Sequence, residues 1–127
     1  MSTTRQAALA HVKGKAAQGD VAGILAALDD YGQHHEFLMN VGPEKGPILA
    51  STVSRLPRGA QVLELGCFCG YSAVLIGNSL PEGARLQGIE VDADSVSVAR
   101  QMVAYAGLAN RVEIIHGSSD KIIPTLE

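Results

Sequence analysis

The stretch Val62–Ile76, VLELGCFCGYSAVLI, decides how the rest of this chain is interpreted. It opens with a short apolar run that contains one carboxylate, Glu64, and it continues with Gly66 and Gly70 on either side of a Cys-Phe-Cys tripeptide. A short run of β-branched residues and leucines is typical of a buried strand, and the letters that follow the second glycine have a helical pattern. The stretch therefore predicts a strand, a glycine loop and a helix.

The same stretch predicts a ligand-binding site. Glu64 comes near the carboxyl end of its strand, where open α/β sheets bind their ligands. Gly66 and Gly70 let the backbone turn sharply and approach a ligand without a Cβ in the way. The helix that begins at Tyr71-Ser72 presents its N-terminal amides to the same crevice. Together these features indicate a site for a nucleotide-type molecule.

The spacing of the glycines indicates which kind of nucleotide. A dinucleotide fingerprint reads G-x-G-x-x-G, whereas this loop reads E-x-G-x-x-x-G and lacks the middle glycine that admits a pyrophosphate. An oxidoreductase that uses NAD is therefore disfavoured. Glu90 lies near the end of the next strand-like run, LQGIEV, where a carboxylate can accept hydrogen bonds from both ribose hydroxyls. With a carboxylate at the loop and no lysine, the site suits a cofactor with a positive centre, and S-adenosylmethionine fits that description.

The segment before this stretch has the pattern of three helices. The first two have apolar residues at helical spacing, with Gly19-Asp20 between them as a break and an N-cap. A glycine-proline turn at Gly42-Pro43 is expected before the third helix. The predicted ranges are Thr3–Ala16, Val21–Tyr31, and from Glu44 or Gly46 to Leu56.

Beyond residue 60, strand-like and helix-like runs alternate. The strand-like runs are QVLEL, RLQGIEV and RVEIIHG, and the helical runs are YSAVLIGNSL, DADSVSVARQMVAYAGL and SSDKIIPTLE. This order predicts an α/β fold, a Rossmann-like doubly wound parallel sheet with right-handed crossovers. We expect one domain over residues 1–127, with a helical segment at 1–58 and a βαβαβα unit at 60–127.

Three parallel strands make only the N-terminal half of a doubly wound sheet. In the strand order 3-2-1, the first strand and its glycine loop lie on an open edge, which normally receives a fourth strand. The chain is thus expected to be an incomplete domain from a longer protein, or a shortened form that completes its sheet by self-association through that edge.

Composition narrows the class of protein. The chain has 127 residues, of which 46% are hydrophobic, so it can bury one modest core and not two. The net charge is −3 and the lysines and arginines are scattered, so nucleic acid is not an expected partner. No apolar run approaches the roughly 18 residues that a membrane span needs. These features predict a soluble, cytoplasmic protein with no membrane partner.

The two cysteines attract attention but predict little chemistry. A bridge between Cys67 and Cys69 would close almost no loop, and structural zinc needs four donors at other spacings. We interpret both as small loop residues.

The histidines are likewise interpreted as ordinary polar residues. Adjacent side chains on a helix point about 100° apart, so His34, His35 and Glu36 are not expected to converge on one ion. They are predicted to face solvent near a helix end. His11 and His116 stand alone in the sequence. His116 ends a strand, so two roles stay open for it, a contact with the adenine region and a structural role.

Four blocks of sequence, taken together, closely resemble the catechol O-methyltransferase family. The blocks follow one another at the family's spacing and cover nearly the whole chain, which is far more specific than a lone E-x-G-x-x-x-G. They are EFLMNVGPEKG, VLELGCFCGYSAV, GIEVDADSVSVARQMVAYAGL and IHGSSDKIIPTL.

The resemblance implies a set of S-adenosylmethionine-binding residues. Those before the third helix would lie near the methionine part, those around the glycine loop would hold the amino-acid end, and those after the second and third strands would meet the ribose and adenine. The implied residues are Met39, Val41, Glu64, Gly66, Gly70, Tyr71, Ser72, Glu90, Val91, Ser119 and Asp120. Five residues depart from those that are common in the family at their positions: Phe37, Phe68, Ile89, Val91 and Asp120.

The resemblance also implies the activity. It is methyl transfer from S-adenosylmethionine to the hydroxyl of a small-molecule catechol or other phenol. In this family Mg²⁺ assists the transfer, but the positions of its ligands and of the general base fall after residue 127. No catalytic or metal-binding residue is therefore expected within this chain. The alternative is a non-catalytic, truncated relative that binds the cofactor or a partner chain.

Overall fold

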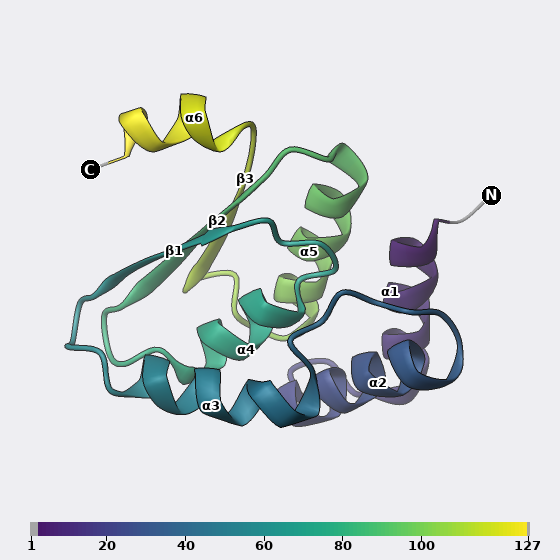
Figure 1. The fold of residues 1–127 in the computed structure, drawn as a ribbon. Coiled ribbons are helices and arrows are strands. Elements are labelled where there is room, and N and C mark those ends of the chain that lie inside the picture. The colour runs from purple at the N-terminus through teal and green to yellow at the C-terminus, as the bar shows by residue number, and fades with distance from the viewer. Residues whose placement is uncertain (1–2, 127) are drawn as a thin grey trace.

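A computed structural model of the chain describes residues 3–126, in which helices and parallel strands follow the predicted order (Figure 1). Three helices come first, and strands then alternate with helices. The elements are α1 Thr4–Lys15, α2 Val21–His34, α3 Gly42–Ser54, β1 Gln61–Leu65, α4 Tyr71–Ser79, β2 Arg85–Glu90, α5 Ala93–Tyr105, β3 Val112–His116, α6 Ser119–Ile122 and the 3₁₀ turn η1 Ile123–Thr125.

The first two helices both begin at a side-chain cap, and the cap of α2, Asp20, is the one that the sequence predicts. Thr3 caps α1 in a capping box with Gln6, and the Asp20 side chain accepts a hydrogen bond from the amide of Gly23 at the start of α2. Helix α2 continues past Tyr31 to His34. Its last turn is solvent-facing, so helical hydrogen bonding continues there without the apolar spacing that marks a helix in the sequence.

Two other helix boundaries differ from the prediction. Helix α3 begins at Gly42, so Gly42-Pro43 forms its first turn and not a separate turn before it. Proline is favoured there because its fixed φ suits a helix and its missing N–H would have had no partner. The last helix is short: α6 ends at Ile122, and Pro124 lies in the 3₁₀ turn that follows.

The sheet has three parallel strands in the order β1-β2-β3, as predicted. Leu65 pairs with Ile89, and Glu90 pairs with His116, so the carboxyl ends of all three strands lie at one end of the sheet. Within the described residues β1 is hydrogen-bonded to β2 alone, which leaves the predicted open edge next to the glycine loop.

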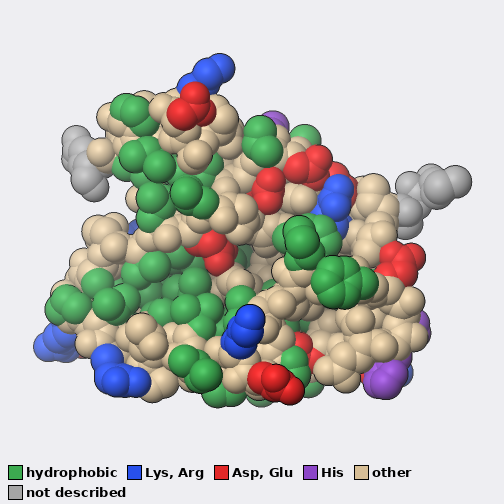
Figure 2. Space-filling model, in the orientation of Figure 1, with side chains coloured by type: hydrophobic (Ala, Val, Ile, Leu, Met, Phe, Trp, Pro, Cys, Tyr) green, Lys and Arg blue, Asp and Glu red, His purple; other side chains and the backbone are tan. Residues whose placement is uncertain are grey.

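Helices α4 and α5 pack on one face of the sheet, and α1, α2 and α3 extend that layer (Figure 1). Val74, Leu86 and Met102 are fully buried between the helices and the strands. The opposite face is uncovered in the part of the chain that the structure describes. Leu63 and Leu65 of β1 are 44% and 59% exposed on it. Figure 2 shows hydrophobic side chains gathered over the strands between α3 and α6.

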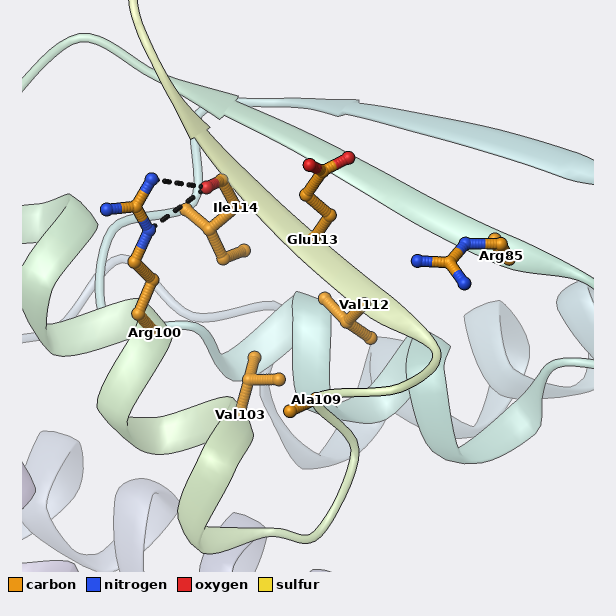
Figure 3. Close-up of a pocket in the computed structure, with 7 residues that line it drawn as sticks. All are labelled: Arg85, Arg100, Val103, Ala109, Val112, Glu113 and Ile114. Carbon is orange, nitrogen blue, oxygen red and sulfur yellow. Dashed lines mark hydrogen bonds between the residues drawn. The ribbon is translucent and has the colours of Figure 1, made fainter.

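The outer edge of β3 is partly covered by an arginine from α5. The Nε and Nη2 atoms of Arg100 both donate to the carbonyl of Ile114, at 3.1 and 2.8 Å (Figure 3). Arg85 and Glu113 line the same shallow hollow, and their charges further disfavour the addition of another strand there. Over residues 3–126 the helices are all too short, or too polar, to cross a bilayer.

Candidate functional site

The predicted binding site lies where the three strands end. The amide of Gly66 donates to the carbonyl of Ile89 at 2.8 Å, and the amide of Gly117 donates to the carbonyl of Glu90 at 3.0 Å. These bonds extend the sheet pairing by one residue beyond β1 and β3. The loops after β1, β2 and β3 therefore meet at the carboxyl end of the sheet, the usual ligand site of open α/β sheets.

The loop after β1 depends on its two glycines in different ways. Both have positive φ, +83° at Gly66 and +89° at Gly70. A Cβ on Gly70 would lie 3.2 Å from the Cα of Ala99, so this glycine lets α4 pack closely against α5. A Cβ on Gly66 would meet no atom within 4 Å. Gly66 thus leaves open space at the surface of the crevice, which suits close approach of a ligand.

Two hollows share this loop. The larger, of about 570 Å³, extends toward α1 and the segment before α3, and the smaller, of about 250 Å³, extends toward the loop after β3. Leu65, Gly66 and Glu90 line both. The larger is also lined by Arg5, Met39, Phe68, Asp92 and Ser95, and the smaller by Ile89, Val91, Gly117, Ser118 and Ser119.

Glu90 lines both hollows, and its carboxylate also binds backbone amides of the glycine loop. Its Oε1 accepts hydrogen bonds from the amides of Cys67 and Phe68 at 2.9 and 3.2 Å, and its Oε2 accepts one from the amide of Asp92 at 3.0 Å. Partial burial alone would raise the pKa of this carboxyl, but these amides outweigh burial and hold the pKa below its usual value. Because a carboxylate has about four acceptor positions, these amides leave at most about one for a ligand, fewer than the two ribose hydroxyls that the sequence pattern predicts.

Glu64 is a second carboxylate, and its pKa is shifted in the opposite direction from that of Glu90. Its Oε1 is buried and has no hydrogen-bond partner among the described residues. Burial raises the pKa of Glu64 to about 7, and the nearby Cys67 and Ser72 side chains only partly offset that rise. A buried acceptor without a partner is costly, so this carboxylate favours a ligand that brings a cationic donor.

The structure gathers five of the eleven predicted residues around the hollows: Met39, Gly66, Glu90, Val91 and Ser119. Met39 and Val91 are 73% and 67% exposed, so both offer apolar surface to a ligand. The remaining six, Val41, Glu64, Gly70, Tyr71, Ser72 and Asp120, do not line either hollow.

Those six have other surroundings. Val41 packs against the hydrophobic core, and Asp120 is exposed in α6. The Tyr71 hydroxyl donates to Asp29 of α2 at 3.1 Å, so the side chain fastens α4 to the N-terminal helices and only its backbone is near the loop. Ser72 lies in the first turn of α4, beside Glu64.

Sequence reasoning missed Arg5. Its guanidinium lies over the ring of Phe68 at 5.5 Å from the centroid, and it forms ion pairs with Asp92 and Asp94 at 3.2 and 2.9 Å. Phe68 itself has a φ of +44°, which is unusual for a residue with a side chain. No local pattern could have identified Arg5, because its partners lie far along the chain.

The two cysteines lie in the loop between β1 and α4, where both are buried and pack against the core. Cys69 is fully buried, and a Cβ on Gly88 of β2 would lie 2.6 Å from the sulfur of Cys67. Both thiols are free, and burial raises the pKa of each to about 12. Neither is suited to nucleophilic or redox chemistry in the folded protein.

The fold is that of the Rossmann-like class I methyltransferases. The O-methyltransferase TomG from Streptomyces achromogenes, solved in complex with S-adenosylmethionine, matches with a TM-score of 0.68 and 30% identity over 81% of this chain and 46% of its own. An O-methyltransferase from Bacillus cereus matches with a TM-score of 0.67 and 24% identity over 83% of this chain and 46% of its own, a likeness of fold alone.

The family follows from sequence. The model of the O-methyltransferase family matches residues 15–127, and this chain belongs to that family. Catechol O-methyltransferase B of Danio rerio is 44% identical over 126 residues, which is 99% of this chain and 47% of the relative. Catechol O-methyltransferase of Mus musculus is 42% identical over 98% of this chain and 47% of its own length. The chain thus spans about half the length of these curated relatives.

Proposed function

We propose that this chain forms the cofactor-binding half of an S-adenosylmethionine-dependent O-methyltransferase that acts on a catechol-type hydroxyl. The observation that carries the proposal is the open space at Gly66, with the partnerless Oε1 of Glu64 close to it in the chain and Glu90 beside it. The chain is 44% and 42% identical to two catechol O-methyltransferases over nearly its whole length, which supports the substrate class.

Each part of the cofactor has a suitable group in the structure. The Glu64 carboxylate would accept the ammonium of the methionine part, and the free acceptor position of Glu90 would take a ribose hydroxyl. The smaller hollow, between Val91 and Ser119, would hold the adenine. Met39 would lie toward the sulfonium in the larger hollow. When bound, the cofactor supplies an electrophilic methyl group.

The acceptor side of the reaction is assigned by resemblance. Mg²⁺ and the general base would be held by residues after position 127, so this half binds and orients the methyl donor. A catechol or related phenol is the proposed partner of the complete protein. A cytoplasmic location belongs to the same proposal, and the two free, buried cysteines are in keeping with a reducing compartment.

Calorimetric titration with S-adenosylmethionine, or with its demethylated product S-adenosylhomocysteine, tests the proposal. We expect one ligand per chain, and binding that is weakened about tenfold or more by Glu90→Ala. Glu113→Ala is the matched control, because Glu113 is an exposed glutamate of β3 that lines neither hollow. Absence of binding to the wild-type protein, or equal binding to the Glu90→Ala variant, would refute the cofactor assignment.

A second candidate function is suggested by the uncovered face of the sheet. If the protein is a short, non-catalytic relative, a second copy would extend the sheet at the open edge of β1, next to the exposed Leu63 and Leu65. Size-exclusion chromatography with light scattering distinguishes the two. A dimer that Leu63→Lys dissociates would support this candidate, and a monomer would exclude it.

A further inference from the structure

Three side chains that are far apart in the sequence meet where α1 packs against the end of α2. They are His11 of α1, Asp30 of α2, and His35, which caps the C-terminus of α2. The Nε2 atom of His11 lies 3.0 Å from Oδ2 of Asp30, and the ligand atoms of all three lie within 4.8 Å of one another. Within residues 3–126 this is the one group of three or more His, Cys, Asp or Glu side chains whose ligand atoms lie this close together.

The two imidazoles are held by a buried aromatic ring. The ring of His35 stacks on Tyr31 with centroids 5.2 Å apart and an interplanar angle of 17°. The ring of His11 lies 5.4 Å from the same tyrosine and 4.9 Å from His35. Because Tyr31 is 7% exposed, it is a fixed support, and both histidines keep one edge near Asp30.

Two imidazole nitrogens and one carboxylate oxygen are the donor set of a zinc site that keeps a fourth position for water. Tetrahedral zinc with bonds of about 2.0–2.1 Å separates its donors by about 3.4 Å. The His11–Asp30 pair already lies at 3.0 Å, and the other separations, all within 4.8 Å, close with small rotations of the exposed Asp30 and His35 side chains. Mg²⁺ and Ca²⁺ prefer six or more oxygen ligands, which this group does not offer.

We propose that His11, Asp30 and His35 form a zinc-binding site that joins α1 to the end of α2. His34, His35 and Glu36 are neighbours on one helix end and cannot converge on one ion, and this ligand set uses only one of them. The other two ligands come from tertiary packing. His34, whose Nε2 lies 3.9 Å from Oδ1 of Asp30, is close enough to order the carboxylate.

Such a site would fix the segment that leads to the larger hollow. His35 directly precedes residues 36–41, which include the exposed Phe37 and Met39. The hydroxyl of Thr4 already donates to the carboxylate of Glu36, so α1 contacts this segment at a second point. Bound zinc would hold α1 and the segment together. The zinc site itself does not depend on the proposed methyltransferase activity.

The test is a calorimetric titration of untagged protein, stripped with EDTA, with Zn²⁺ alone. We expect one zinc per chain, with affinity reduced about tenfold or more in each of His11→Gln, Asp30→Asn and His35→Gln. His116→Gln is the matched control, because this histidine lies at the end of β3, bonded to the carbonyl of Val91, and its removal should leave zinc affinity unchanged. Co²⁺ in place of Zn²⁺ should give the visible bands of a tetrahedral site.

A stability measurement keeps the test decisive if a variant is poorly folded. Zinc should raise the thermal unfolding midpoint of the wild-type protein and leave that of His35→Gln unchanged, since zinc stabilises only a folded state that binds it. Asp30 and His35 are exposed, so their variants should fold normally in EDTA. No zinc binding to wild type, or equal loss in His116→Gln, would overturn the site. If the protein did not bind S-adenosylhomocysteine, the cofactor proposal would fail, but the zinc titration would still test the zinc site by itself.

Discussion

Arg5 and Asp94, separated by 89 residues in the chain, are joined by a hydrogen bond of 2.9 Å from Nε to Oδ2. The same carboxylate accepts from the Thr3 hydroxyl and from the Gln6 side-chain amide, each at 2.8 Å. These hydrogen bonds hold the pKa of Asp94 below its usual value, and the bond from Thr3 has the largest effect. The first turn of α1 is thereby fastened to the first turn of α5, at the lip of the larger hollow.

The first prediction is that Arg5→Ala weakens cofactor binding. Removal of the guanidinium takes away its ion pairs with Asp92 and Asp94 and its contact with Phe68, so the lip of the hollow is less ordered. Because the ion pairs are partly exposed, we expect a modest effect, about threefold to tenfold in S-adenosylhomocysteine affinity. Isothermal titration calorimetry measures it.

Arg58→Ala is the control for that experiment. Arg58 pairs with Glu82, both side chains are 77% exposed, and neither lies near the hollows. We expect unchanged affinity and an unchanged unfolding midpoint. If Arg5→Ala and Arg58→Ala behaved alike, the contact between α1 and α5 would have no part in shaping the site.

The strand-loop-helix unit could be predicted because its information is local. Alternating apolar runs identified β1, β2 and β3, and the spacing of Gly66 and Gly70 located the loop. The direction of the Tyr71 side chain, the position of Arg5 and the meeting of His11 with His35 could not be predicted. Each depends on how the N-terminal helices pack against elements distant in the chain, which no local periodicity encodes.

The second prediction separates the two glycines of the loop. Gly70→Ala should lower the free energy of unfolding by about 1–3 kcal/mol, because it adds strain at positive φ and a contact of 3.2 Å with Ala99. Gly66→Ala should cost less stability, about 1 kcal/mol, but should weaken S-adenosylhomocysteine binding about tenfold or more, since its methyl group enters the space left for the ligand. Urea unfolding and calorimetry measure the two quantities.

Gly14→Ala is the matched control for the glycine pair. Gly14 lies in α1 and a Cβ there would meet no atom within 4 Å, so alanine should stabilise the protein by up to about 1 kcal/mol. Equal loss of binding in Gly70→Ala and Gly66→Ala, at temperatures where both are folded, would contradict the separate roles assigned to them.

The third prediction concerns the cysteines. Because Cys67 and Cys69 are buried and burial raises the pKa of each thiol to about 12, neither should react with Ellman's reagent at pH 8 while the protein is folded. Both should react fully once the protein is unfolded in guanidinium. Rapid reaction of one thiol in the native protein would show that the loop opens readily, and the packing of Cys67 beneath Gly88 would then need revision.

The last prediction is a pH dependence set by Glu64. Burial raises the pKa of this carboxyl from 4.5 to about 7, so between those values the folded state keeps a proton that the unfolded state releases. The contribution of Glu64 to stability is therefore lost as the pH rises from about 4.5 to 7. Glu64→Gln should remove that loss and raise the unfolding free energy at pH 8 by up to about 3 kcal/mol.

Binding should change in the opposite direction. A cationic ligand group requires ionised Glu64, so wild-type affinity for S-adenosylhomocysteine should fall as the pH drops below about 7. Glu64→Gln should bind weakly at every pH, with a flat profile, while the exposed Glu113→Gln should follow wild type. Calorimetric titrations from pH 5.5 to pH 8.5 measure the profiles. This range extends about 1.5 pH units on either side of the pKa of Glu64. A Glu64→Gln profile as steep as that of wild type would assign the titration to another group and remove Glu64 from the site.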